Sequence, residues 1–97
     1  MRGYPTILVA GIGYSQLIEG LRRDGYHVLE AAEWDDVLRT ITLHSRPIHL
    51  LVGDESMENR APLLQKHRPW LLFFFASSPV DVGASLARIK QLVVPPP

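Results

Sequence analysis

The segment HLLVGDESM, residues 49–57, places an acidic side chain directly after an apolar run. Leu50, Leu51 and Val52 are typical of a buried strand, and Asp54 follows where such a strand would reach the surface. A carboxylate in that position can accept a phosphoryl group, hold a metal or a ribose hydroxyl, or cap the next turn. Each role requires different neighbours, which the rest of the chain has to provide.

A glycine-rich turn near the start of the chain is the second candidate. Gly11 and Gly13 follow the apolar run of residues 6–10 and precede a helical pattern. Glu30 ends the next apolar stretch, at about the 20-residue spacing of a dinucleotide-binding fingerprint, whose acid holds the ribose. Gln16, however, replaces the third glycine of that fingerprint and would keep the helix from a close approach to a pyrophosphate. Gly11, Gly13 and Glu30 are therefore candidates for an anion or nucleotide loop, and the alternative is a turn without a ligand.

The other polar residues offer no catalytic pair. The chain has no cysteine, which excludes disulfides, thiolate zinc sites and a cysteine nucleophile. Ser77 and Ser78 would need a base beside them, and the expected order of elements places no histidine there. The four histidines do not have metal-ligand spacing. We therefore expect no enzymatic turnover.

Composition limits the partners. The chain has 97 residues and no net charge, with 46% apolar and 21% charged residues, as expected for one small globular domain. No basic excess exists to attract nucleic acid or an anionic membrane. The most apolar segment, residues 70–76, is far too short to span a bilayer, and no signal-peptide-like run follows Met1. We expect a cytoplasmic protein that binds neither nucleic acid nor membrane.

The elements that would position the candidate residues are short apolar runs that alternate with amphipathic stretches. Strands are expected at residues 6–10, 26–30, 48–53, 70–75 and 92–94, and helices from the N-cap Ser15 to residue 24, over residues 34–41, around residues 62–67 and at 85–90. Runs that are apolar on both faces indicate a parallel sheet covered by helices on both sides. The carboxyl ends of its strands would gather the glycine turn, Glu30, Asp54 and Ser77 at one edge.

In this order the segments resemble the receiver domains of bacterial response regulators over most of the chain. ILVAGIGYSQLIEGLRRDGYHVLEAAEWDDVL, residues 7–38, is similar to the first half of a receiver. RPIHLLVGDESM, residues 46–57, is similar to the stretch that carries the phosphoacceptor, with Asp54 at that position. RPWLLFFFASS, residues 68–78, resembles the fourth strand, with Ser77 at the hydroxyl position that contacts the phosphoryl group.

The resemblance implies a fold as well as a site. We expect a single α/β domain over residues 1–97 with a flavodoxin-like, three-layer fold. Its five-stranded parallel sheet would have the order 2-1-3-4-5, and the final helix of the family would be missing, as in a chain truncated at its C-terminus.

The chain departs from the family where the family holds Mg²⁺. The acidic pair that follows the first strand of a receiver is replaced by Gly11 and Ile12, and the family's lysine falls at Val94 or is absent. Phosphoryl transfer to a carboxylate depends on a metal and a cation to neutralise the charge of two anions. We therefore expect Mg²⁺ binding to be weak or absent and phosphorylation of Asp54 to be impaired.

The resemblance thus implies a degenerate receiver, or pseudo-receiver, that signals by protein–protein contact in a two-component phosphorelay. Since the final helix is missing, apolar surface over the first and fifth strands should be covered by a protein partner or a second copy. The glycine turn leaves one alternative open, a small Rossmann-type nucleotide-binding regulatory domain. A further alternative is a fragment without a separate activity.

Overall fold

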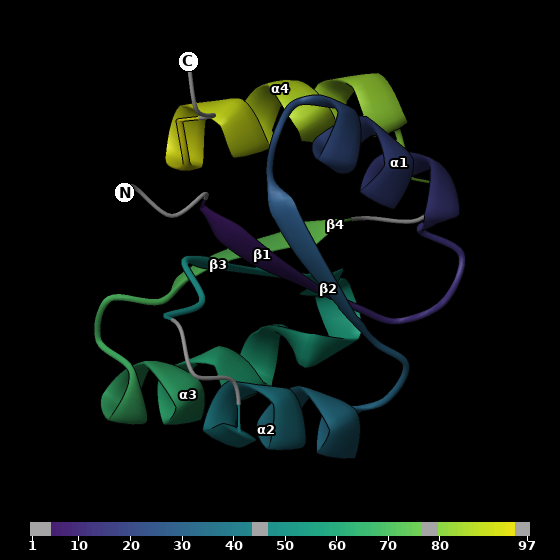
Figure 1. Ribbon diagram of the computed structural model, residues 1–97. Coiled ribbons are helices and arrows are strands. Elements are labelled where there is room, and N and C mark those ends of the chain that lie inside the picture. The colour runs from purple at the N-terminus through teal and green to yellow at the C-terminus, as the bar shows by residue number, and fades with distance from the viewer. Residues whose placement is uncertain (1–4, 44–46, 77–79, 95–97) are drawn as a thin grey trace.

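The computed structural model describes residues 5–43, 47–76 and 80–94, in which strands and helices alternate (Figure 1). The strands are β1 (Thr6–Ala10), β2 (His27–Ala31), β3 (Leu50–Asp54) and β4 (Leu72–Ala76). The helices are α1 (Ser15–Arg23), α2 (Trp34–Leu43), the 3-10 helix η1 (Glu55–Arg60), α3 (Ala61–His67) and α4 (Val82–Leu92). Within these ranges, no helix combines the length and the apolar character needed to cross a bilayer.

The four strands form one parallel sheet in the order β2-β1-β3-β4. From β1 the chain moves first to one side, to β2, and then back across to β3 and β4. Because such crossovers are right-handed, α1 lies on one face of the sheet and α2 and α3 lie on the other (Figure 1). The prediction of a parallel α/β sheet with the order 2-1-3-4 is confirmed, and this order is consistent with a flavodoxin-like fold.

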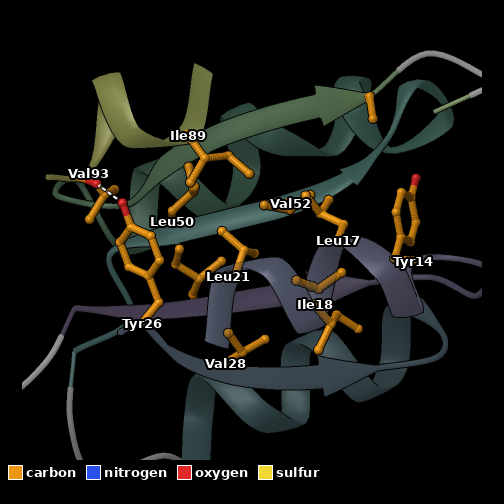
Figure 2. Packing of buried hydrophobic residues seen from close by; sticks show 13 residues of the cluster. Tyr14, Leu17, Ile18, Leu21, Tyr26, Val28, Leu50, Val52, Ile89 and Val93 are labelled. Atoms are coloured by element: carbon orange, nitrogen blue, oxygen red, sulfur yellow. Dashed lines mark hydrogen bonds between the residues drawn. The ribbon is translucent and has the colours of Figure 1, made fainter. Parts of the chain in front are cut away.

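The central strand β1 separates two apolar cores. Successive side chains of a strand point to opposite faces, so Ile7 and Val9 join the core under α1 and α4 (Figure 2). Leu8 and Ala10 join the core under α2 and α3. All four side chains are at most 1% exposed, which explains why this run is apolar at every position rather than at every second one.

Helix α1 presents the expected apolar stripe to the first core, where Leu17, Ile18 and Leu21 are buried. Its start differs from the prediction. Ser15 is the first helical residue, Tyr14 occupies the N-cap position, and no side chain caps the helix there. The turn before the helix directs the ring of Tyr14 into the core, so the residue that was expected to cap the helix has already entered it.

The predicted fifth strand is wrong. Leu92 is the last residue of α4, and the described residues after it form no strand. Leu86, Ile89 and Val93 recur at helical spacing and pack against the core under α1, with Ile89 fully buried. The run Leu92 to Val94, which by itself is typical of a strand, therefore continues the apolar stripe of a helix.

The position of α4 also corrects the expectation of a bare face. A right-handed connection from β4 to a further parallel strand would carry its helix on the face of α2 and α3. Helix α4 instead packs beside α1 on the opposite face (Figure 1). It therefore closes the face that was expected to lack its last helix, and the outer edge of β4 has no strand partner among the described residues.

Two polar contacts hold the end of α4 to this face. The buried hydroxyl of Tyr26 donates a hydrogen bond to the carbonyl of Val93 (Figure 2). Lys90 Nζ lies 3.2 Å from Asp24 Oδ2, in the turn that joins α1 to β2. Both contacts join the last helix to residues that follow the first helix.

We expect Tyr26→Phe to lower the free energy of unfolding by about 1–3 kcal/mol, because the buried carbonyl of Val93 loses its donor. Tyr14→Phe is the matched control, since the hydroxyl of Tyr14 has no hydrogen bond to another described residue. The control should change stability by less than about 0.5 kcal/mol. Urea unfolding followed by circular dichroism measures both, and equal losses would contradict the docking of α4 described above.

Candidate functional site

The reversal of strand order creates a switch point between β1 and β3, where ligands of open parallel sheets bind. Beyond the carboxyl ends of these strands lies a hollow of about 590 Å³. Residues 12–17, Asp54, Ala76, Val80 and Val82 line it. The structure thus brings the β1–α1 turn and Asp54 together, as the sequence predicts.

The two glycines of the turn are required by its backbone. Gly11 has a φ of 118° and Gly13 a φ of 86°, conformations that other residues rarely adopt. A Cβ atom on Gly11 would also lie 3.0 Å from the Tyr14 ring, which folds back against the turn. The glycines are therefore explained by the turn itself, and they carry no implication of a bound phosphate on their own.

Tyr14 is a site residue that the sequence did not identify. Its side chain is 7% exposed, and its hydroxyl points away from the packed core (Figure 2). Burial, and secondly the negative charge of Asp54, raise the pKa of Tyr14 above its ordinary value. The phenol is therefore held as a neutral donor near a carboxylate. An aromatic residue beside a helical stripe is typical of a core position, and no signal in the sequence distinguished it.

Asp54 caps the next element, as one of the considered roles predicts. Its Oδ1 accepts the Ser56 N–H at 2.8 Å and also the Ser56 hydroxyl, so that Asp54 is the N-cap of η1. Asp54 also pairs in register with Ala76, the last residue of β4. Ser77, the predicted hydroxyl neighbour, lies outside the described residues.

The described residues around Asp54 do not fit a magnesium site. Mg²⁺ is held by carboxylates and waters in octahedral geometry. Where the family has its acidic pair, Gly11 has no side chain and the Ile12 side chain is apolar and 86% exposed. No group of three acidic, histidine or cysteine residues that could hold a metal occurs within residues 5–43, 47–76 and 80–94.

A second hollow, of about 310 Å³, lies between the glycine turn and the end of β2. Gly11, Gly13 and Glu30 all line it, so the predicted nucleotide-loop residues do meet. The N–H of Gly11, however, donates to the Ala31 carbonyl at 2.7 Å and is not available to a ligand.

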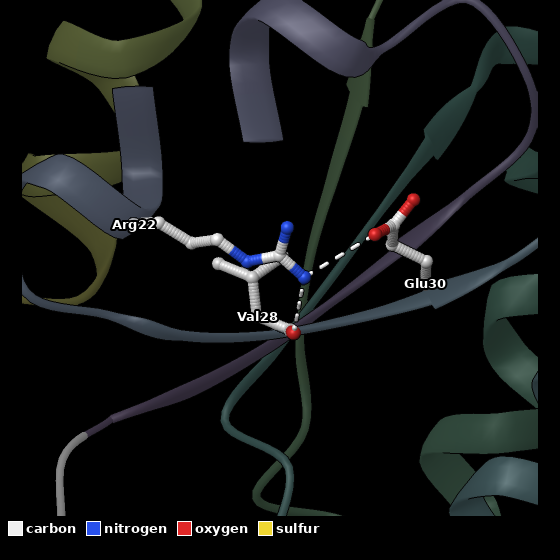
Figure 3. A network of polar contacts seen from close by, with 3 residues as sticks. All are labelled: Arg22, Val28 and Glu30. Atoms are coloured by element: carbon white, nitrogen blue, oxygen red, sulfur yellow. Dashed lines mark hydrogen bonds and ion pairs between the residues drawn. The ribbon is translucent and has the colours of Figure 1, made fainter. Parts of the chain in front are cut away.

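Glu30 itself is already paired. Arg22 Nη2 lies 3.2 Å from Glu30 Oε2 and also donates to the Val28 carbonyl at 3.3 Å (Figure 3). Both charged side chains are more than half exposed, and exposed pairs contribute little to stability. The contact fixes the direction of the carboxylate toward α1 without burying it.

No protein-family model, no curated protein and no solved structure matches the chain. The receiver resemblance accordingly rests on the sequence segments given above, and the fold supports only its coarse architecture.

We expect Asp54→Asn to lower the pKa of Tyr14, because one of the two causes of its elevation is removed. The pKa should remain above the ordinary value of about 10, since burial is the larger cause. Tyrosinate absorbance against pH measures the shift, and Tyr14→Phe identifies which titration belongs to this residue. An unchanged titration would show that Asp54 and Tyr14 do not share the site.

The same elevation makes stability depend on pH. Folded Tyr14 keeps its proton at pH values at which the unfolded chain releases it. This contribution to stability is therefore complete below pH of about 10 and is lost as pH rises through the folded pKa.

Proposed function

We propose that this chain is a receiver-like signalling module with impaired phosphoacceptor chemistry, which acts by protein–protein contact in a two-component phosphorelay. The observation that carries the proposal is the position of Asp54. It ends the third strand of a parallel 2-1-3-4 sheet, at the switch point, in one hollow with the β1–α1 turn. The order of the receiver-like segments along the chain supports the same assignment, and a cytoplasmic location is part of the proposal.

The surroundings of Asp54 explain why its chemistry would be slow. An Asp54 oxygen that attacks phosphorus brings a negative carboxylate to a negative phosphoryl group, and the repulsion has to be neutralised. The residues that line the hollow include no lysine or arginine. Oδ1 is held by Ser56, and Tyr14 offers one neutral donor. The carboxylate is thus placed for contact or residual acceptance more than for rapid phosphoryl transfer.

We expect the wild-type chain to take up only a trace of label from a small acyl phosphate donor, and Asp54→Asn to remove that trace. Ile12→Asp should raise labelling in a Mg²⁺-dependent manner, because residue 12 lines the same hollow as Asp54 and a second carboxylate would help to hold the ion. Acid-gel or mass-spectrometric detection of the acyl phosphate measures both effects.

Ile12→Asn is the matched control, with a side chain of similar size and no charge. A label that survives Asp54→Asn would show that Asp54 is not the acceptor. A gain with Ile12→Asn equal to that with Ile12→Asp would show that the metal is not involved.

The second candidate function is a nucleotide-binding regulatory domain, and the hollow shared by Gly11, Gly13 and Glu30 favours it. The commitment of the Gly11 N–H to Ala31 speaks against it. We expect titration with NAD(H) or ATP to give no saturable change in the fluorescence of Trp34 or Trp70. A saturable change that Glu30→Gln weakens would replace the receiver proposal with this one.

A further inference from the structure

The outer edge of β4 differs from the other edge of the sheet. β4 pairs with β3 along one side, and no described strand pairs with its other side. Its sequence, LFFFA, contains no charge and no proline, and Leu72 is 40% exposed while Phe73, Phe74 and Phe75 are half-buried. At the opposite edge, β2 carries the exposed side chains of His27 and Glu30.

An edge of this kind invites another strand. Edge strands in native proteins are blunted by charges, prolines, bulges or a covering segment, because their free N–H and C=O groups template pairing. β4 has none of the first two devices, and Trp70, just before it, adds an apolar side chain that is 56% exposed. The unpaired row of backbone groups is therefore bordered by apolar surface.

Charge along this edge is unevenly distributed. Basic residues gather at the start of β4, namely Lys66, His67 and Arg68. Acidic residues gather at its other end, namely Glu55 and Glu58 of η1, which contacts β4, and Asp81, which caps α4. Two cations lie toward the acidic end, but Arg60 stacks on Trp34 and Arg88 bonds to Gln91. An antiparallel copy would place basic ends opposite acidic ends, whereas a parallel copy would oppose like charges.

We propose that two copies of this chain associate through antiparallel pairing of their β4 strands, which joins the two sheets into one. A two-fold axis at Phe74 would place Phe73 of one copy opposite Phe75 of the other. These two rings already stack within one chain, with centroids 5.9 Å apart, so the pairing extends an aromatic row across the axis. The absence of net charge leaves no general repulsion between copies.

This inference rests on the proposed function in one respect, since it names the protein contact by which the module would act. It moves the expected partner surface from the face now covered by α4 to the edge of β4.

Sedimentation of the full chain over a range of concentrations tests the pairing. We expect a dimer in the micromolar range, and Leu72→Lys should weaken dimerisation by more than roughly tenfold, because two lysines would be introduced at the strand-to-strand contact. Leu43→Lys is the matched control, on an α2 residue that is 74% exposed and lies away from β4, and should leave dimerisation unchanged. Circular dichroism checks that both variants are folded.

Two further measurements separate this pairing from other association. Hydrogen exchange should slow in β4 when the concentration is raised, and added salt should weaken the dimer because it screens the opposed charges. A strict monomer at high micromolar concentration, equal loss with both lysine variants, or protection located away from β4 would overturn the inference. A monomer in which an added extended peptide protects β4 would assign the edge to a foreign strand instead.

The proposed function can fail independently. A dimer without any Asp54 labelling would refute the receiver chemistry and leave the pairing in place. Labelling that requires Asp54 in a strictly monomeric chain would do the reverse.

Discussion

The burial of β1 on both faces is the constraint on which the rest of the structure depends. Ile7 and Val9 need one apolar layer above the sheet, and Leu8 and Ala10 need another below it, so helices must cover both sides. A strand buried in this way can pair only with strands that are covered as well, which favours a parallel sheet with crossover helices. The same strand determines the site, because its neighbours β2 and β3 leave it in opposite directions and open the hollow at its carboxyl end.

The chemistry of that hollow differs from what a phosphoryl-transfer site requires. A carboxylate, a neutral phenol and the backbone of a glycine turn meet there without a second acid and without a cation among the lining residues. Asp54 is both the cap of η1 and the residue that the resemblance places at the phosphoacceptor position, and these roles are compatible because capping uses one of its two oxygens. A site of this composition supports recognition and contact better than turnover, which is the physical basis for a signalling module rather than an enzyme.

The face on which α4 packs changes where the protein can meet others. A helix that led from β4 to another strand would have left the α1 face open, and the apolar surface there would have required a partner. Because α4 docks against Leu50 and Val52 through Ile89, that surface is internal, and the exposed apolar residues lie instead along β4. An open strand edge binds through main-chain hydrogen bonds in a defined direction, so it selects strand-like partners where a helical face would not.

The sequence by itself determined the order of elements, the parallel sheet, the apolar stripe of α1 and the place of Asp54 at the end of a strand. These features follow from periods of two and of 3.6 residues, which local side-chain patterns record directly. Only the tertiary structure decided that residues 92–94 are not a strand, that Tyr14 lines the site and that Glu30 pairs with Arg22. A short apolar run carries no information on which neighbour will cover it, and a polar side chain carries none on which distant residue will reach it, so these outcomes depend on how the assembled layers pack.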